Sequence, residues 1–195
     1  KALPHVEQVL NIYLQTRGPD HLVTLQGLAD EVVVLALVGQ TTEAANLLRM
    51  FDSGMRKRLP QHAPELAEML ALVSAVLPRH GKAEATEQFL RQSLAHFEKA
   101  APDEWPTARV RSLLGGVLLA QKKYEVAEPL LLKGYEGLKR REKDIPRPHA
   151  ACVLEALDRL IDLYAALDKP DEVQKYRELR TKHPFVAPMP RVQPK

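Results

Sequence analysis

Residues 113–131 read LLGGVLLAQKKYEVAEPLL, and this stretch decides the fold. Leu114 and Gly115 are predicted to lie in a first helix, Lys122 in a turn, and Ala127 in a second helix. The small residues Gly115 and Ala127 are twelve positions apart. Two antiparallel helices cross closely only where small side chains meet, and leucines at helical spacing seal their sides. The stretch therefore predicts a helical hairpin.

The same register recurs in three other parts of the chain. The copies are Val32-x-x-Leu35 with Ala44-x-x-x-Leu48, Ser74-x-x-Leu77 with Thr86-x-x-x-Leu90, and Leu160-Ile161-x-x-Tyr164 with Val173. The turns fall at Gly39, Gly81, Lys122 and Asp168, at spacings of 42, 41 and 46 residues. Each hairpin alone would expose an apolar face, which stacking against the next hairpin buries. We therefore predict an all-α fold, a right-handed superhelical solenoid of antiparallel helix pairs.

The ends of the chain differ from its middle. Residues 1–17 form one amphipathic pattern, which predicts a half-repeat helix, and residues 18–182 hold about four helix pairs. Residues 183–195 are rich in proline, so we expect an extended, poorly ordered tail. The chain starts at Lys1 without an initiator methionine, which suggests a segment of a longer protein.

Local signals agree with these boundaries, with two awkward places. We expect Asp103 to cap a helix and Pro170 to begin one. Pro129 falls inside a predicted helix, where it should remove one hydrogen bond and bend the helix. Residues 32–38 are branched and apolar enough for a strand, but their register predicts a helix buried on nearly all sides. Proline and glycine breakers lie between the predicted helices at Gly18-Pro19, Pro60, Pro102 and Pro146-Arg147-Pro148.

Composition narrows the possible functions. Aromatic residues make up 5% of the chain and glycines number nine, a profile typical of helix-rich proteins. A net charge of +3 is too small for the electrostatic footprint of a nucleic-acid-binding protein. The longest apolar run has seven residues, whereas a membrane span needs about 20. The single cysteine, Cys152, allows no internal disulfide and fits a cytoplasmic location.

Two motifs carry a resemblance to known families. One is Gly18-Pro19-Asp20-His21-x-x-Thr24-Leu25; the other comprises Pro102-Asp103-Glu104-Trp105, Ser112-Leu113-Leu114-Gly115-Gly116 and residues 121–137. With the spacing near 42, the chain resembles the tetratricopeptide repeats of kinesin light chains and their bacterial relatives. The second motif, and the closing residues 154–164, resemble the C-terminal repeats of large bacterial serine/threonine protein kinases.

The resemblance implies a protein-binding module. In a longer parent protein, a kinase domain would precede the repeats. The repeats would recruit substrates or regulators to that kinase, and the parent protein could also be anchored in a membrane. The segment has no glycine-rich loop, no His-Arg-Asp and no Asp-Phe-Gly, so we expect no catalysis from it and no cofactor.

Resemblance also implies which side chains face the concave groove, because positions 2, 5 and 9 of each first helix do so in this repeat class. The fourth copy places Glu155, Asp158 and Asp162 there, on one helix face. These carboxylates would repel one another unless a basic peptide or a facing arginine relieved them. The equivalent places hold Arg109 and Ser112 in the third copy, and Gln26 with the apolar Ala29 and Val33 in the first.

Other interpretations stay open. Terminal repeats could associate with another copy of the chain, giving a structural role. The basic clusters 56–58 and 139–141 could bind nucleic acid or an anionic surface, although the helix dipole also favours cations at helix ends. His149 and Cys152 are only two potential metal ligands, so we expect a packed cysteine beside an exposed histidine. Trp105 is expected to cover a helix start, and Tyr135 to pack between repeats.

Overall fold

The structure, a computed structural model, describes residues 3–183. In that range the chain is helical and has no strand, which confirms the all-α prediction. The helices are α1 (Leu3–Arg17), α2 (Leu22–Leu37), α3 (Thr41–Arg58), α4 (Ala63–Val76), α5 (Ala83–Ala100), α6 (Trp105–Ala120), α7 (Tyr124–Arg140), α8 (Ala151–Ala166) and α9 (Pro170–Thr181). Three short 3-10 helices are η1 (Leu77–His80), η2 (Glu142–Asp144) and η3 (Arg147–His149). None of the described helices is long and apolar enough to cross a membrane.

The four predicted turns are confirmed by backbone conformation. Gly39 and Gly81 have φ angles of 81° and 73°, and Lys122 and Asp168 have φ angles of 60° and 52°. All four residues therefore adopt the left-handed conformation that ends a helix and reverses the chain. Glycine reaches this conformation without strain, whereas lysine and aspartate do so less readily.

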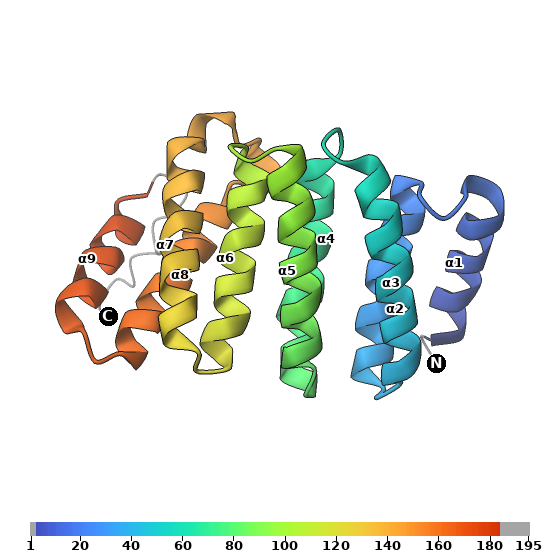
Figure 1. The fold of residues 1–195 in the computed structure, drawn as a ribbon, viewed down its shortest axis with the longest axis horizontal. Coiled ribbons are helices and arrows are strands. Elements are labelled where there is room, and N and C mark those ends of the chain that lie inside the picture. The colour runs from blue at the N-terminus through green and yellow to red at the C-terminus, as the bar shows by residue number, and fades with distance from the viewer. Residues whose placement is uncertain (1–2, 184–195) are drawn as a thin grey trace, which may run out of the picture.

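The helices follow one another in chain order along the longest axis of the molecule, from α1 at one end to α9 at the other (Figure 1). Within successive pairs, α2 packs on α3, α6 on α7 and α8 on α9. Across pairs, α2 contacts α4, α4 contacts α6 and α6 contacts α8. We call α2, α4, α6 and α8 the first-helix row. One apolar core runs through the array from Leu10 in α1 to Tyr176 in α9.

Glycines allow the closest helix crossing, between α6 and α7. A Cβ atom at Gly134 would lie 2.8 Å from the backbone nitrogen of Ser112, and one at Gly137 would lie 2.6 Å from the Cβ of Ala108. Since real Cβ atoms do not approach so closely, this crossing requires residues without a side chain. The third hairpin, whose sequence decides the fold, is thus tightly closed.

Two local expectations are wrong. Glu104, not Asp103, occupies the N-cap position of α6, and no side chain caps that helix. The run at residues 32–38 is helical up to Leu37, as predicted, but Leu37 and Val38 are each 56% exposed, so the run is not buried on nearly all sides. Leu37 is the last residue of α2 and Val38 is its C-cap, so the exposed side chains lie where the helix ends.

The predicted helix start at Pro170 is confirmed, whereas the bend expected at Pro129 stays a prediction. Pro170 is the first residue of α9, with Asp171 and Glu172 in its first turn. Pro129 lies inside α7, which continues through it to Arg140. The lost hydrogen bond falls near the start of that helix, where its removal leaves most of the backbone ladder intact. The proline-rich tail expected at 183–195 lies outside the described residues except for His183.

Candidate functional site

One position of the repeat builds a chain of charges along the first-helix row. Gln26, Glu68, Arg109 and Glu155 are equivalent residues of the four copies, separated by 42, 41 and 46 residues. The Arg109 Nη2 atom lies 2.7 Å from Glu68 Oε2 on α4 and 3.8 Å from Glu155 Oε2 on α8. One arginine therefore joins carboxylates from the neighbouring pairs on both sides. We call the connected residues Glu68, Arg109, Glu155 and Arg159 the ion-pair ladder.

Arg109 is the buried centre of the ladder. The residue is 3% exposed, while the side chains of Glu68 and Glu155 are 39% and 41% exposed. A buried guanidinium is tolerated only where carboxylates offset its lost hydration. Nη2 serves both carboxylates, whereas Nε and Nη1 are buried without a hydrogen-bond partner. The ladder therefore contains a buried arginine, two of whose nitrogens have no hydrogen-bond partner, between two half-exposed carboxylates.

Arg159 continues the ladder on α8. Its Nη2 atom lies 3.5 Å from Glu155 Oε2, and its Nη1 atom donates to Ser112 Oγ at 3.3 Å. A Cβ atom at Gly116 would lie 3.0 Å from the Arg159 Cδ and Nε atoms, so the glycine makes room for this side chain on α6. Burial lowers the pKa of the Arg159 guanidinium, against the opposing effect of Glu155. Arg159 is thus a partly desolvated cation held by long hydrogen bonds.

The other end of the ladder is tied to the α7–α8 connection. His149 Nδ1 in η3 lies 2.9 Å from Glu68 Oε1, and the His149 ring packs on Trp105 with centroids 5.3 Å apart. Burial would raise the pKa of Glu68, but hydrogen bonds from Arg109 and His149 outweigh burial, and the pKa is lowered. The expected exposed histidine is wrong: the His149 side chain is only 19% exposed, because Glu68 and Trp105 cover it.

The six groove residues expected from the sequence separate into groups. Arg109, Ser112 and Glu155 are brought together by the ladder. Asp158 pairs with Arg180 of α9, whose Nη2 lies 3.1 Å from Asp158 Oδ2. Asp162 is exposed and has no partner among the described residues. Gln26 is at the far end of the row, where it donates to Asp30 at 2.9 Å.

The acidic stripe expected on α8 is therefore not a free row of carboxylates. Glu155 lies opposite Arg109, the facing arginine considered from the sequence, and Asp158 is neutralised from its own helix pair by Arg180. Only Asp162 presents an uncompensated acid to solvent. A basic ligand would have to compete with arginines that are already in place.

A hollow of about 540 Å³ opens beside the ladder, between the C-terminal parts of α4, α6 and α8. Ala75 and Gly116 are among the small residues that line it, and Arg79, Lys122, Arg159 and Asp162 supply its charges. Small residues on the helices leave the space open, and the turns that follow α4 and α6 contribute Arg79 and Lys122. We call this cavity the basic hollow.

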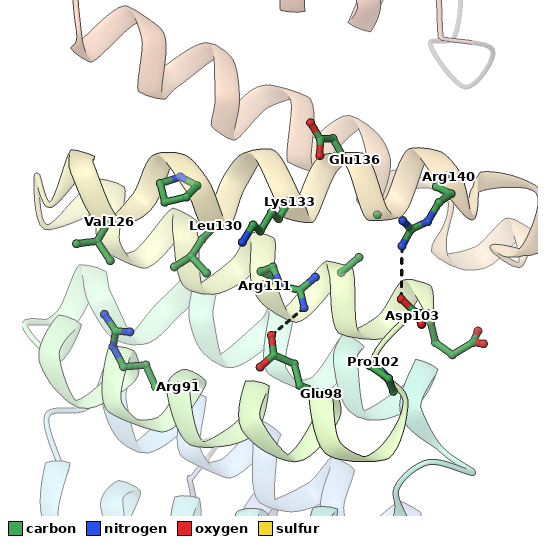
Figure 2. A pocket seen from close by; sticks show the side chains of 14 residues that line it. Arg91, Glu98, Pro102, Asp103, Arg111, Val126, Leu130, Lys133, Glu136 and Arg140 are labelled. Atoms are coloured by element: carbon green, nitrogen blue, oxygen red, sulfur yellow. Dashed lines mark hydrogen bonds and ion pairs between the residues drawn. The ribbon is translucent and has the colours of Figure 1, made fainter.

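A second hollow, of about 560 Å³, lies between α5 and α7 over α6 (Figure 2). Its charges are Arg91, Arg111, Lys133 and Arg140 against Glu98, Asp103, Glu104 and Glu136. Arg111 pairs with Glu98 at 2.8 Å, and Arg140 lies 3.8 Å from Asp103. Cations and anions are balanced here, and the dashed lines of Figure 2 show two of the pairs.

One arginine of each basic cluster makes a hydrogen bond within the fold. Arg58 Nε donates to the backbone oxygen of Asp20, and Arg141 Nε donates to that of Asp103 at 3.1 Å. In both cases the arginine follows its acceptor by 38 residues, so it is one repeated device. We call it the arginine clamp. It fastens the end of a second helix to the loop that leads into the first helix of the same pair.

The remaining candidates have structural surroundings. Cys152 is 1% exposed, and burial raises the pKa of its thiol to about 11, which disfavours the nucleophilic thiolate. Among residues 3–183, no three His, Cys, Asp or Glu side chains gather as metal ligands would. Tyr135 packs between repeats as expected, edge-to-face on Tyr176 with ring centroids 6.0 Å apart. Trp105 is 4% exposed at the first residue of α6, consistent with its expected place over a helix start.

Sequence reasoning missed Glu68 and Arg159, and it named His149 without its contact to Glu68. Glu68 could have been found, because it stands at the same repeat position as Gln26, Arg109 and Glu155. Arg159 has no such signal: it follows Glu155 by four residues, a spacing common on helix surfaces. His149 reaches Glu68 across 81 residues of sequence, a contact that no local pattern contains.

Comparison of the sequence with protein-family models gave no match, and comparison with curated proteins gave none either. The resemblance to tetratricopeptide repeats accordingly rests on the residues quoted above.

Proposed function

We propose that this chain is a tetratricopeptide-like scaffold, a right-handed superhelical array of about four helix pairs that binds protein or peptide ligands along its first-helix row. The observation that carries the proposal is the ion-pair ladder. Equivalent residues of three successive copies, Glu68, Arg109 and Glu155, meet side by side. Such contacts arise when successive hairpins stack in register, which is how repeat arrays create one extended surface.

Binding is the activity that this surface supports best. The ladder exposes the carboxylates of Glu68 and Glu155 in part, and the basic hollow beside it is lined by charged and small side chains from α4, α6 and α8. Interfaces of this kind use a few polar side chains for specificity over a pre-formed shape. We propose that the segment itself is non-catalytic, and that it serves as a recruitment or regulatory arm of a bacterial serine/threonine kinase.

Partner capture tests the binding function. The purified chain, carrying a photo-cross-linking amino acid at Ala75 beside the basic hollow, is exposed to bacterial lysate and its adducts are identified by mass spectrometry. The same amino acid at Lys133, in the hollow between α5 and α7, is the matched control. The proposal expects a reproducible protein adduct at Ala75 that is absent at Lys133. Equal adducts at both positions, or none at Ala75, would contradict it.

The kinase association has its own test. The genomic reading frame upstream of Lys1 should encode a glycine-rich loop, His-Arg-Asp and Asp-Phe-Gly in the order of a protein kinase. A frame that encodes only further repeats would support a stand-alone repeat protein instead.

A further inference from the structure

The charges of the basic hollow differ from those of the ladder beside it. Three cations, Arg79, Lys122 and Arg159, line the hollow against a single carboxylate, Asp162. The side chains of Arg79, Lys122 and Asp162 make no hydrogen bond or ion pair with any other described residue. In the hollow between α5 and α7, by contrast, four cations face four acids. Arg159 is already paired with Glu155, so Arg79 and Lys122 against Asp162 leave the basic hollow with an excess of positive charge on the face proposed to bind ligands.

Arg159 is suited to receive an anion. Its two hydrogen bonds, to Ser112 and Glu155, measure 3.3 and 3.5 Å, both longer than the usual charge-assisted bond of about 2.7–2.9 Å. Burial already disfavours its charged form, so an arriving carboxylate would restore lost solvation. Gly116 keeps the approach open, because any larger residue there would meet the Arg159 side chain.

We propose that the basic hollow is the seat of an acidic segment of a partner protein, with Arg159 contacting a carboxylate and Arg79 and Lys122 flanking it. This inference rests on the proposed binding function and names its ligand class. It reverses the expectation from sequence, in which the carboxylates of α8 would attract a basic peptide. The reversal follows because Arg109 and Arg180 neutralise Glu155 and Asp158 within the fold.

The hollow also has a size that suits this occupant. A volume of about 540 Å³ lies within the range of pre-formed ligand sites and accommodates a few side chains of an extended peptide. Two small lining residues, Ala75 and Gly116, would contact the peptide backbone or a small side chain. Its cations come from two turns and from α8, so they surround the opening from several elements.

Fluorescence anisotropy with three short labelled peptides tests the inference. The peptides share one apolar pattern and carry glutamate, lysine or glutamine at the same places. We expect the glutamate peptide to bind the wild-type chain about tenfold more tightly than the glutamine peptide at low salt, and the lysine peptide to bind most weakly. Added salt should weaken the binding of the glutamate peptide more than that of the other two peptides.

Variants locate the binding site. Arg79→Glu with Lys122→Glu should reverse the peptide preference, whereas Lys133→Glu with Arg140→Glu, which changes net charge equally in the hollow of Figure 2, should leave it unchanged. Arg159→Gln should weaken the binding of the glutamate peptide about tenfold, measured as its dissociation constant. If Arg159→Gln lowers helicity by circular dichroism, it is replaced by Gly116→Ala, whose Cβ atom would lie 3.0 Å from the Arg159 Cδ and Nε atoms and would shift that side chain slightly.

Two results would overturn the inference: a lysine peptide that binds as tightly as the glutamate peptide, or a glutamate preference that survives the Arg79 and Lys122 reversal. Failure of all three peptides to bind at low salt overturns it as well. None of these outcomes touches the proposed function, which depends on the cross-linking adduct at Ala75.

Discussion

The third hairpin, α6 with α7, and the second hairpin, α4 with α5, come from the same repeat but pack differently. The third is the closest helix pair of the molecule, while α4 and α5 contact each other sparsely and η1 packs between them. In the third hairpin the crossing positions hold Gly115, Gly134 and Gly137; the equivalent residues of the second are Ser74, Ser93 and His96. Larger side chains at these positions keep the helices apart.

The second hairpin also lacks the arginine clamp. Ala100 stands where Arg58 and Arg141 stand in the first and third copies, and the acceptor position is His62. His96 turns away from α4 instead, and its Nε2 lies 3.3 Å from Asp52 Oδ1 on α3. A repeat period therefore predicts where hairpins form, while a few side chains decide how tightly each one closes.

The strongest test of this contrast is the pair Gly134→Val and Ser93→Val. We expect Gly134→Val to lower the free energy of unfolding by about 3 kcal/mol, because its side chain would overlap the Ser112 backbone. Ser93→Val, at the equivalent place, should lower it by about 1 kcal/mol. Denaturant unfolding followed by circular dichroism measures both. Equal losses would mean that the glycines do not set the difference.

Hydrogen exchange compares the hairpins without mutation. The amides in the middle of α6 and α7 should need about 2 kcal/mol more to open than those of α4 and α5, because sparse packing lowers the cost of local opening. Mass spectrometry of peptic fragments resolves the helices. If α5 proves as protected as α7, its packing on α6 compensates for its sparse contact with α4.

A further test introduces the arginine clamp into the second hairpin and removes it from the third. Ala100→Arg places a guanidinium opposite the backbone oxygen of His62 and should stabilise the chain by up to about 1 kcal/mol. Arg141→Ala should destabilise it by a similar amount of about 1 kcal/mol, since the Arg141 bond to Asp103 is lost. Thermal unfolding of both variants checks the signs. An Arg141→Ala variant as stable as wild type would show that the clamp contributes nothing.

The smallest expected effect concerns pH. Glu68 ties α4 to α6 through Arg109, and its pKa is lowered in the folded chain. A lowered acid pKa means that this stabilisation is complete above the unfolded pKa and is lost as pH falls through the folded pKa. Protection of α4 should therefore decrease below about pH 4.5, by less than about 1 kcal/mol because Glu68 is half-exposed. Glu68→Gln should remove this pH dependence and leave α7 unaffected.

Much of the fold could be predicted from pattern alone. Helix existence, the four turns and the start at Pro170 follow from side-chain periodicity and backbone preference, which are local properties. The N-cap at Asp103 was wrong, because capping depends on a backbone geometry that one residue shift alters. The candidate site was predicted less well: Arg109 was considered as an arginine facing the acids of α8, but Arg180, the partner of Asp158, was not identified.

The difference between what the sequence predicts and what only the structure shows has a physical cause. Small and bulky residues that recur at spacings of 41 to 46 determine where helices begin, turn and pair. They do so because the residues that make two neighbouring hairpins fit together recur at the same positions of the sequence pattern. The charge along the first-helix row is decided by contacts between different helices, such as Glu68 with His149, 81 residues apart, and Asp158 of α8 with Arg180 of α9. Coulomb energy depends on distance in space, so the unpaired cations of the basic hollow were visible only after the helices had been placed.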